Sequence, residues 1–309
     1  MTLRELGCYQ PRMSDQGTHQ STVRDLVALT KPSIAGLSMF MTVGGYLLAG
    51  GGDTITTICA LFGTALIVGS ANALNMAWEF ETDALMSRTA DRPIPAGRLS
   101  VKVATAFGLL WGVLGLGLLF GGVNTLTGLI GLLSLVVYVC VYTPLKLRSP
   151  WALIVGAFPG AAPPLIGWTA AADGLHWPGL LLFGVLFLWQ IPHFLAISLY
   201  RRTEYDRAGI KTWPISRGDA AAKRLALAYS TALIPCSLAL VAVDAAGLFY
   251  LAVALPTGFW FWSVTVRGFA REVRITKWAR QLFIASLLYL PIIMFGLGFD
   301  RLMHLILAP

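Results

Sequence analysis

The sequence predicts an all-α membrane protein in which nine transmembrane helices surround a central cavity. The first observation is composition: 56% of the 309 residues are hydrophobic and 12% are charged, with a mean hydropathy of +0.70, whereas soluble domains carry about 25% charged residues. The second observation is that long apolar runs recur along the whole chain. These runs are continuous, whereas the strands of a transmembrane β-barrel would alternate between apolar and polar residues.

Each apolar run is close to the length of about 20 residues that a spanning helix needs. The polar stretches between the runs are too short to form an independent soluble domain. We therefore expect a polar cytoplasmic tail at residues 1–27 and a single transmembrane domain at residues 28–309. The predicted spans are residues 31–51, 55–78, 103–122, 124–142, 151–171, 179–200, 225–244, 247–267 and 280–299.

The basic residues are distributed unevenly among the connections between spans. Apart from Arg301, every Lys and Arg lies before or at the start of the first span, or after the second, fourth, sixth or eighth span. The positive-inside rule then predicts a multi-pass protein of the cell inner membrane, with a cytoplasmic N-terminus and an outer C-terminus. The net charge of +8 is explained by orientation in a lipid bilayer, so no nucleic-acid partner is expected.

The segment from Asn75 to Asp83 places three oxygen-bearing side chains four residues apart, at the end of the second span. On a helix, Asn75, Glu79 and Asp83 share one face, while Glu81 is rotated about 200° from Glu79. One interpretation is a polar helix end solvated at the membrane interface. The other is a site for a hard divalent cation such as Mg²⁺.

A second acidic segment follows the sixth span, where Glu204 and Asp206 compete for the role of a second metal-binding cluster. The second and sixth spans run in the same direction, so the two acidic segments emerge at the same membrane face. A shift of four helices between them is typical of a parallel internal repeat. We favour Glu204 as the ligand because it stands in a Tyr-x-x-Ala-Gly context.

Incomplete acidic clusters suit Mg²⁺ bound together with phosphate oxygens, because Mg²⁺ takes few protein carboxylates. Nearby basic residues would neutralise a departing diphosphate. The residues alone therefore indicate a membrane enzyme or transporter acting on a lipid diphosphate. Transporter sites usually lie near the bilayer midplane, whereas these clusters lie at one face, which favours an enzyme.

The segment from Asn75 to Asp83 resembles the first aspartate-rich motif of the UbiA-type intramembrane prenyltransferases. Further stretches resemble the protoheme IX farnesyltransferase branch of that superfamily, in the same order from about Lys31 to Pro214. These stretches are Arg88–Arg98, Tyr142–Arg148, Gly156–Trp168, Trp189–Phe194 and Glu204–Gly209. This sequence departs from the superfamily pattern in having Glu79 rather than Asp, and Glu204 where paired Asp residues are common.

The resemblance implies that Mg²⁺ bridges Asn75, Glu79, Asp83 and Glu204 to farnesyl diphosphate. A vinyl group of heme B would attack the allylic cation left by diphosphate departure, and water addition would complete heme O. A quinone-precursor ring or chlorophyllide as acceptor remains an alternative. The residues expected to bind substrate are Arg88, Arg92, Tyr142, Lys146, His193, Arg202 and Tyr205.

His193 lies within the sixth span, and it is either a heme contact or a buried hydrogen-bonding residue. A heme-using partner enzyme could dock on the basic loops.

Overall fold

The computed structural model describes residues 19–307, and within that range every regular element is a helix. The all-α prediction is confirmed. Residues 1–18, most of the predicted tail, lie outside the described part. The longer helices are α1 (His19–Leu29), α2 (Pro32–Leu48), α3 (Thr54–Trp78), α5 (Val101–Gly122), α6 (Thr125–Val136), α8 (Ala152–Ala172), α9 (Trp177–Tyr200), α12 (Asp219–Ala242), α13 (Leu248–Val266) and α14 (Ile275–Leu307). The short elements are α4 (Phe80–Ala84), η1 (Val137–Tyr142), α7 (Thr143–Leu145), α10 (Arg202–Arg207), α11 (Trp213–Arg217) and η2 (Arg267–Phe269).

Each predicted span corresponds to a helix of the described residues. Eight helical stretches are individually long and apolar enough to cross a membrane, counting α6, η1 and α7 as one stretch over residues 125–145. The first predicted span is divided between two helical segments, Thr22–Leu29 and Pro32–Leu48, which meet at an angle of 46°. The two segments are long and apolar enough to cross a membrane only when they are counted together. The bend falls at Lys31, which has a left-handed φ of 49°. The predicted boundary between residues 27 and 28 falls inside α1.

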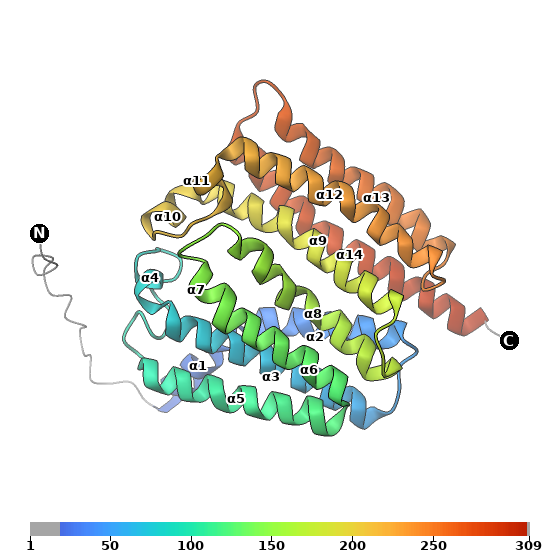
Figure 1. The fold of residues 1–309 in the computed structure, drawn as a ribbon, viewed down its shortest axis with the longest axis horizontal. Helices are drawn as coiled ribbons and strands as arrows, with labels where there is room; N and C mark the ends of the chain where they lie inside the picture. The colour runs from blue at the N-terminus through green and yellow to red at the C-terminus, as the bar shows by residue number, and fades with distance from the viewer. Residues whose placement is uncertain (1–18, 308–309) are drawn as a thin grey trace, which may run out of the picture.

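The long helices run side by side in a bundle, with the first half of the chain in one part and the second half in the other (Figure 1). In the first part, α3 packs against α5 and α2 packs against α8. In the second part, α9 packs against α12 and α14, and α13 packs against α14. Contacts between α8 and α9 join the two parts.

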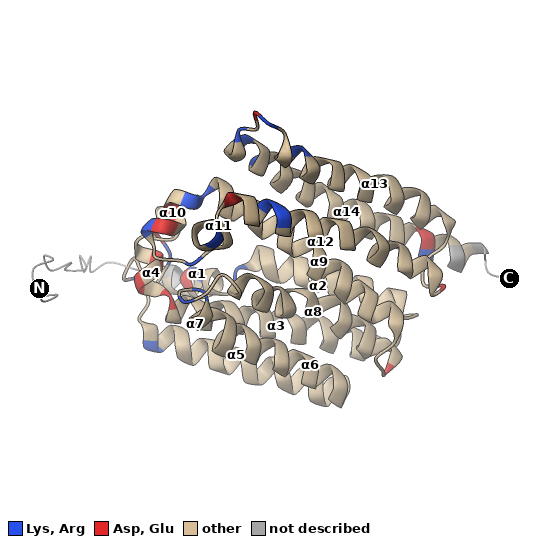
Figure 2. Cartoon of the chain, turned by 45° about the horizontal axis from the view of Figure 1, so that its top comes forward, with Lys and Arg blue, Asp and Glu red and all other residues tan. Residues whose placement is uncertain are grey.

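The short helices α4 and α10 lie at the same end of the bundle (Figure 1). Each of them directly follows a spanning helix, α3 and α9 respectively, and these helices are four spans apart. This arrangement is the one that a parallel four-helix repeat predicts. Charged residues gather at this end, and the sides of the bundle are almost free of them (Figure 2).

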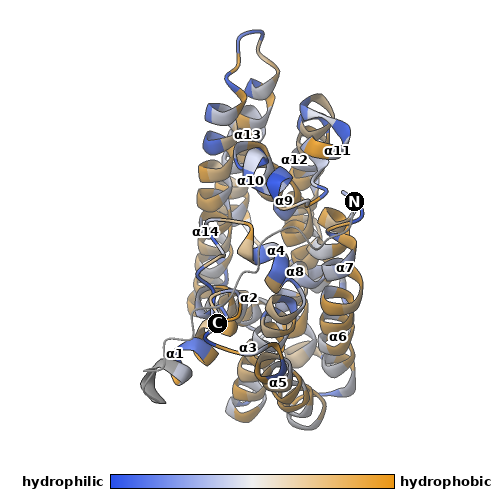
Figure 3. Ribbon diagram, turned by 90° about the vertical axis from the view of Figure 1, so that its left-hand side faces the viewer, coloured by the Kyte–Doolittle hydropathy of each residue, from blue (hydrophilic) through white to orange (hydrophobic). Residues whose placement is uncertain are grey.

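The sides of the bundle are apolar, as an environment of lipid chains requires. Large hydrophobic side chains such as Leu110, Val113 and Leu114 of α5 and Phe295 of α14 are exposed. In the view that brings the end with α4 and α10 forward, hydrophilic segments lie around α4 and α10, and much of the surrounding long helices is hydrophobic (Figure 3).

Glycine permits the close approach of α2 and α8. A Cβ atom added at Gly167 would collide with the backbone carbonyl of Thr42, and one added at Gly45 would collide with that of Pro164. Small residues commonly allow backbones to approach in membrane helix packing. The close contact between α2 and α8 therefore requires glycine, which has no Cβ atom, at both positions.

We expect Gly167→Ala to lower the unfolding temperature in detergent, because the added methyl group meets backbone that cannot rotate away. The expected loss is about 1–3 kcal/mol, the usual range for overpacking. Gly117→Ala in α5 is the matched control, since no atom lies within 4 Å of a Cβ there. An unchanged unfolding temperature for Gly167→Ala would contradict the proposed close contact.

Candidate functional site

The three side chains of the first acidic segment lie together at the C-terminal end of α3 and in α4. The backbone N–H of Glu79 donates to the Asn75 carbonyl at 2.9 Å, and that of Asp83 donates to the Glu79 carbonyl at 2.8 Å. Helical spacing therefore continues across the break between α3 and α4. Asn75, Glu79 and Asp83 are 3%, 4% and 1% exposed, whereas Glu81 is exposed. The predicted stripe forms and faces the interior.

Basic side chains hold both carboxylates of the stripe. Lys146 Nζ lies 2.9 Å from Glu79 Oε2, and Arg92 Nη1 lies 2.5 Å from Asp83 Oδ2. Asn75 Nδ2 donates to Thr143 Oγ1 at 3.1 Å. The second carboxylate oxygen of Glu79, Oε1, is buried and has no hydrogen-bond partner in the described part of the chain. This oxygen is a buried acceptor whose hydrogen-bonding capacity is unused.

Lys146 reaches Glu79 from the end of a helix with an irregular turn. The π-helical segment η1 ends at Tyr142, and Thr143 Oγ1 donates to the Tyr138 carbonyl at 2.8 Å. π-helical turns are often found at functional sites. Burial lowers the pKa of Lys146, but the neighbouring Tyr142 and Glu79 raise it by more, so its pKa lies above the ordinary value. Lys146 is therefore a cation.

The loop after α4 turns back over the stripe. Thr89 Oγ1 donates to the backbone carbonyl of Asp83 at 2.7 Å, which places Arg92 beside the Asp83 carboxylate. Farther along, Arg98 pairs with Asp25 of α1 at 3.1 Å. These bonds fix the loop between the N-terminal helix and the acidic stripe.

Glu204 of α10 contacts the same loop from the second half of the chain. Its Oε1 accepts from Ser87 Oγ at 3.3 Å and from the Arg88 backbone N–H at 3.4 Å, and Arg201 pairs with its Oε2 at 3.0 Å. Partial burial raises the pKa of Glu204, but the bonds from Arg201 and the Arg88 N–H lower it by more, so this pKa lies below its ordinary value. Glu204 is an anion at neutral pH.

Two further contacts connect the halves of the site. Tyr205 packs in a small cluster with Met86, and the backbone N–H of Lys211 donates to the Lys146 carbonyl at 3.1 Å. The second acidic segment therefore contacts the loop that directly follows the first, at the same end of the bundle. The acids of the two segments are not grouped as ready-made metal ligands, since the described residues contain no cluster of three or more Asp, Glu, His or Cys side chains.

The other predicted binding residues lie farther from the stripe or face outward. The Arg88 side chain is exposed, and Arg202 pairs with Asp219 at 2.9 Å. Asp206, the alternative to Glu204, is exposed. His193 is half-buried within α9, where its Nδ1 lies 2.7 Å from Ser286 Oγ and its ring stacks on Trp189 at 5.0 Å.

Lys31 is a basic neighbour of the site. From the sequence, it was expected only to help orient the protein in the membrane. It occupies the bend between α1 and α2, half-buried, and interacts electrostatically with Glu79, Asp83, Arg92 and Lys146. The sequence feature that could have indicated its place in the site is its position directly before Pro32, the proline at the start of the first span. Three basic side chains thus lie around two buried carboxylates.

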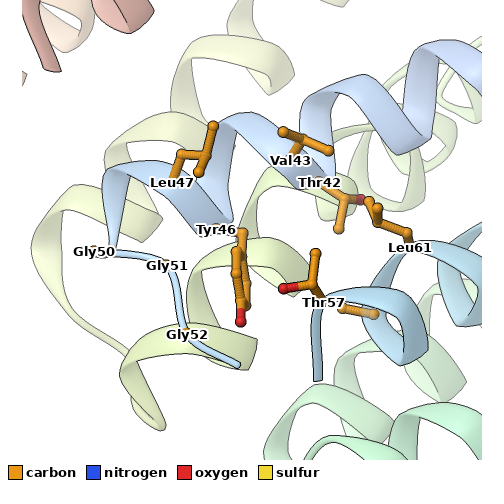
Figure 4. A pocket seen from close by; sticks show the side chains of 10 residues that line it. Thr42, Val43, Tyr46, Leu47, Gly50, Gly51, Gly52, Thr57 and Leu61 are labelled. Carbon is orange, nitrogen blue, oxygen red and sulfur yellow. The ribbon is translucent and has the colours of Figure 1, made fainter. Parts of the chain in front are cut away.

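A hollow of about 280 Å³ lies at the other end of α3, between that helix, α2 and the glycine loop at residues 50–52. Tyr46 and Thr57 border it in Figure 4. Because Thr57 precedes Asn75 by five helical turns, this hollow is roughly 27 Å from the acidic stripe. It is separate from the charged site.

Comparison with known proteins places this geometry in a family. The sequence model of the UbiA prenyltransferase family matches residues 38–287. The chain belongs to the UbiA prenyltransferase family. As a member with many apolar spanning helices, it is a multi-pass membrane protein.

Relatives within the UbiA family are similar over nearly their full length. A protein named protoheme IX farnesyltransferase from Myxococcus xanthus is 43% identical over 90% of this chain and 94% of the relative. One of the same name from Sorangium cellulosum is 48% identical over 75% of this chain and 82% of the relative.

Solved structures share the fold at low identity. A digeranylgeranylglyceryl phosphate synthase matches with a TM-score of 0.79 at 15% identity, covering 91% of this chain and 99% of that one. A UbiA homologue from Archaeoglobus fulgidus bound to GPP and Mg²⁺ matches with a TM-score of 0.65 at 14% identity, covering 89% and 99%.

We expect Lys146→Met to destabilise the protein, because it leaves Glu79 charged and buried without its cation. Breaking one partner of a buried pair typically costs about 3–5 kcal/mol, which a lowered unfolding temperature in detergent would report. Arg202→Met is the control: its pair with Asp219 is 48% and 27% exposed, and such pairs contribute about 0–1 kcal/mol. Equal decreases in unfolding temperature for Lys146→Met and Arg202→Met would contradict the pairing of Lys146 with a buried Glu79.

Proposed function

We propose that this protein is a protoheme IX farnesyltransferase, which transfers the farnesyl group of farnesyl diphosphate to a vinyl group of heme B and gives heme O. The observation that carries the proposal is identity of 43–48% with proteins of that name over most of the chain. The overall reaction consumes heme B, farnesyl diphosphate and water, and it releases diphosphate. The farnesyl C–O bond breaks, a C–C bond to the vinyl carbon forms, and water supplies the new hydroxyl group.

The residues at the acidic stripe fit a Mg²⁺ ion. Oxygen donors are the ligands that hard cations prefer, and the partnerless Oε1 of Glu79 is such a donor. Asn75, Glu79 and Asp83 would hold the metal, with Glu204 completing the site from α10. A metal bound here supplies positive charge that stabilises the departing diphosphate.

The surrounding cations bind the phosphate oxygens in this proposal. Arg92 and Lys146 already lie within salt-bridge distance of the stripe, Lys31 lies near it at the α1–α2 bend, and the Arg88 side chain is exposed in the loop that follows α4. Tyr142 borders Lys146, with Nζ 5.9 Å from the ring centroid. Stabilisation of the leaving group carries the chemistry, so no covalent nucleophile is needed.

The acceptor would approach from the bundle interior between α9 and α14. His193 is half-buried there and its ring stacks on the buried Trp189, an aromatic pair that suits the flat face of a porphyrin. His193 in this proposal contacts heme B, while Arg202 and Tyr205 line the inner mouth. The predicted central cavity would hold the farnesyl chain.

We also propose an inner-membrane location, with the N-terminus cytoplasmic and the C-terminus on the outer side, since the basic loops lie at the α4 and α10 end (Figure 2). Residues 1–27 would form the cytoplasmic tail and residues 28–309 the transmembrane domain. A heme-using partner enzyme would dock on the basic loops at this inner end.

The test of the function is to incubate membranes containing the protein with heme B, farnesyl diphosphate and Mg²⁺ and to detect heme O by mass. We expect product with the wild type and a loss of at least about 100-fold with Asp83→Asn and with Glu204→Gln, since removing one preorganised electrostatic group typically costs about 10²–10³ in rate. Lys102→Met, an exposed charge at the start of α5, should retain full activity. Wild-type membranes that make no heme O would refute the proposal.

A further inference from the structure

The carboxylates of the acidic stripe are already neutralised by the protein itself. Lys146 holds Glu79 and Arg92 holds Asp83, both carboxylates being nearly completely buried. Lys31 is a further basic side chain nearby. A lone dication entering this site would therefore meet carboxylates that are already paired with two cations, and no group of three acidic or metal-binding side chains is preassembled among the described residues.

We infer that Lys146 and Arg92 are exchangeable counter-ions, which release Glu79 and Asp83 to a divalent cation only when diphosphate oxygens are present to receive the two basic side chains. The inference rests on the proposed function and deepens it, because it makes metal and diphosphate binding mutually dependent.

Charge balance is the physical reason. Moving Lys146 away from Glu79 without another anion would leave a partly buried cation unpaired beside an incoming dication, and charges that are shielded from water are strongly unfavourable when unpaired. Diphosphate removes this penalty, since its oxygens accept charge-assisted hydrogen bonds from both Lys and Arg. The exchange keeps every buried charge paired before and after binding.

The geometry provides the path for this exchange. Only one oxygen of Glu79 is bonded to Lys146, and the other, Oε1, is buried without a partner. Lys146 is 22% exposed and Arg92 is 20% exposed at their side chains, against 3% for Glu79 and 2% for Asp83. The basic groups therefore have room to move, whereas the carboxylates are fixed by the helix.

Thermodynamic linkage makes the coupling reciprocal: diphosphate increases the affinity for metal, and metal increases the affinity for diphosphate, by the same factor. We expect a factor of at least about tenfold, within the range of about 5–150-fold that coupled sites typically show. The experiment titrates the purified full-length protein with Mn²⁺ and follows free Mn²⁺ by electron paramagnetic resonance, with and without inorganic pyrophosphate, after correction for Mn²⁺–pyrophosphate association in solution.

Two variants distinguish exchange from simple co-binding. Lys146→Gln and Arg92→Gln each free one carboxylate, so both variants should bind Mn²⁺ alone at least about fivefold more tightly than the wild type. In both variants, pyrophosphate should increase the affinity for Mn²⁺ by less than about fivefold. Using both variants guards against one that fails to fold. Lys102→Gln, an exposed charge at the same end of the bundle, should behave as the wild type.

A wild type that binds Mn²⁺ equally well with and without pyrophosphate would overturn the inference, as would variants whose affinity for Mn²⁺ alone is unchanged or lower. Absence of Mn²⁺ binding under every condition would also overturn it. Failure of the proposed function is a separate result: intact coupling without heme O would reject the acceptor and leave the exchange in place.

Discussion

Two carboxylates buried in an apolar helical bundle impose the main constraint on this structure. Glu79 and Asp83 are almost inaccessible, and burying a charge is strongly unfavourable unless it is paired and hydrogen-bonded. Each pairing brings a distant segment to the end of α3. Lys146 comes from the end of the α6–α7 stretch, and Arg92 comes from the loop that follows α4.

The local irregularities of the fold serve this arrangement. The π-helical turn η1 leads into Lys146, the left-handed Lys31 bends the first span, and the break at Glu79 separates α3 from α4. Each of these features departs from a regular helix at the charged end of the bundle. Regular helices and tight glycine contacts, such as that of Gly167 with Thr42, form the rigid part that holds them.

The charged end of the molecule explains how one family can act on prenyl diphosphates inside a membrane. Diphosphate chemistry needs positive charge at the leaving group, whereas the prenyl chain needs an apolar environment. Placing acids and bases at one end of an apolar bundle separates these requirements along the helix axis (Figure 2). Glu204, which contacts the Ser87–Arg88 turn from the second half of the chain, connects the two parts at this charged end.

The sequence alone determined the helical membrane fold, the positions of the spans and the common face of Asn75, Glu79 and Asp83. These features follow from hydrophobic run length and from 3.6 residues per turn, which are local properties of the chain. Only the tertiary structure decided which cation meets which acid. Lys146 lies 67 residues from Glu79, and Glu204 lies 117 residues from Ser87. Lys31 joins the site only because the first span bends. Such pairings depend on how helices pack, and no periodicity in the sequence encodes them.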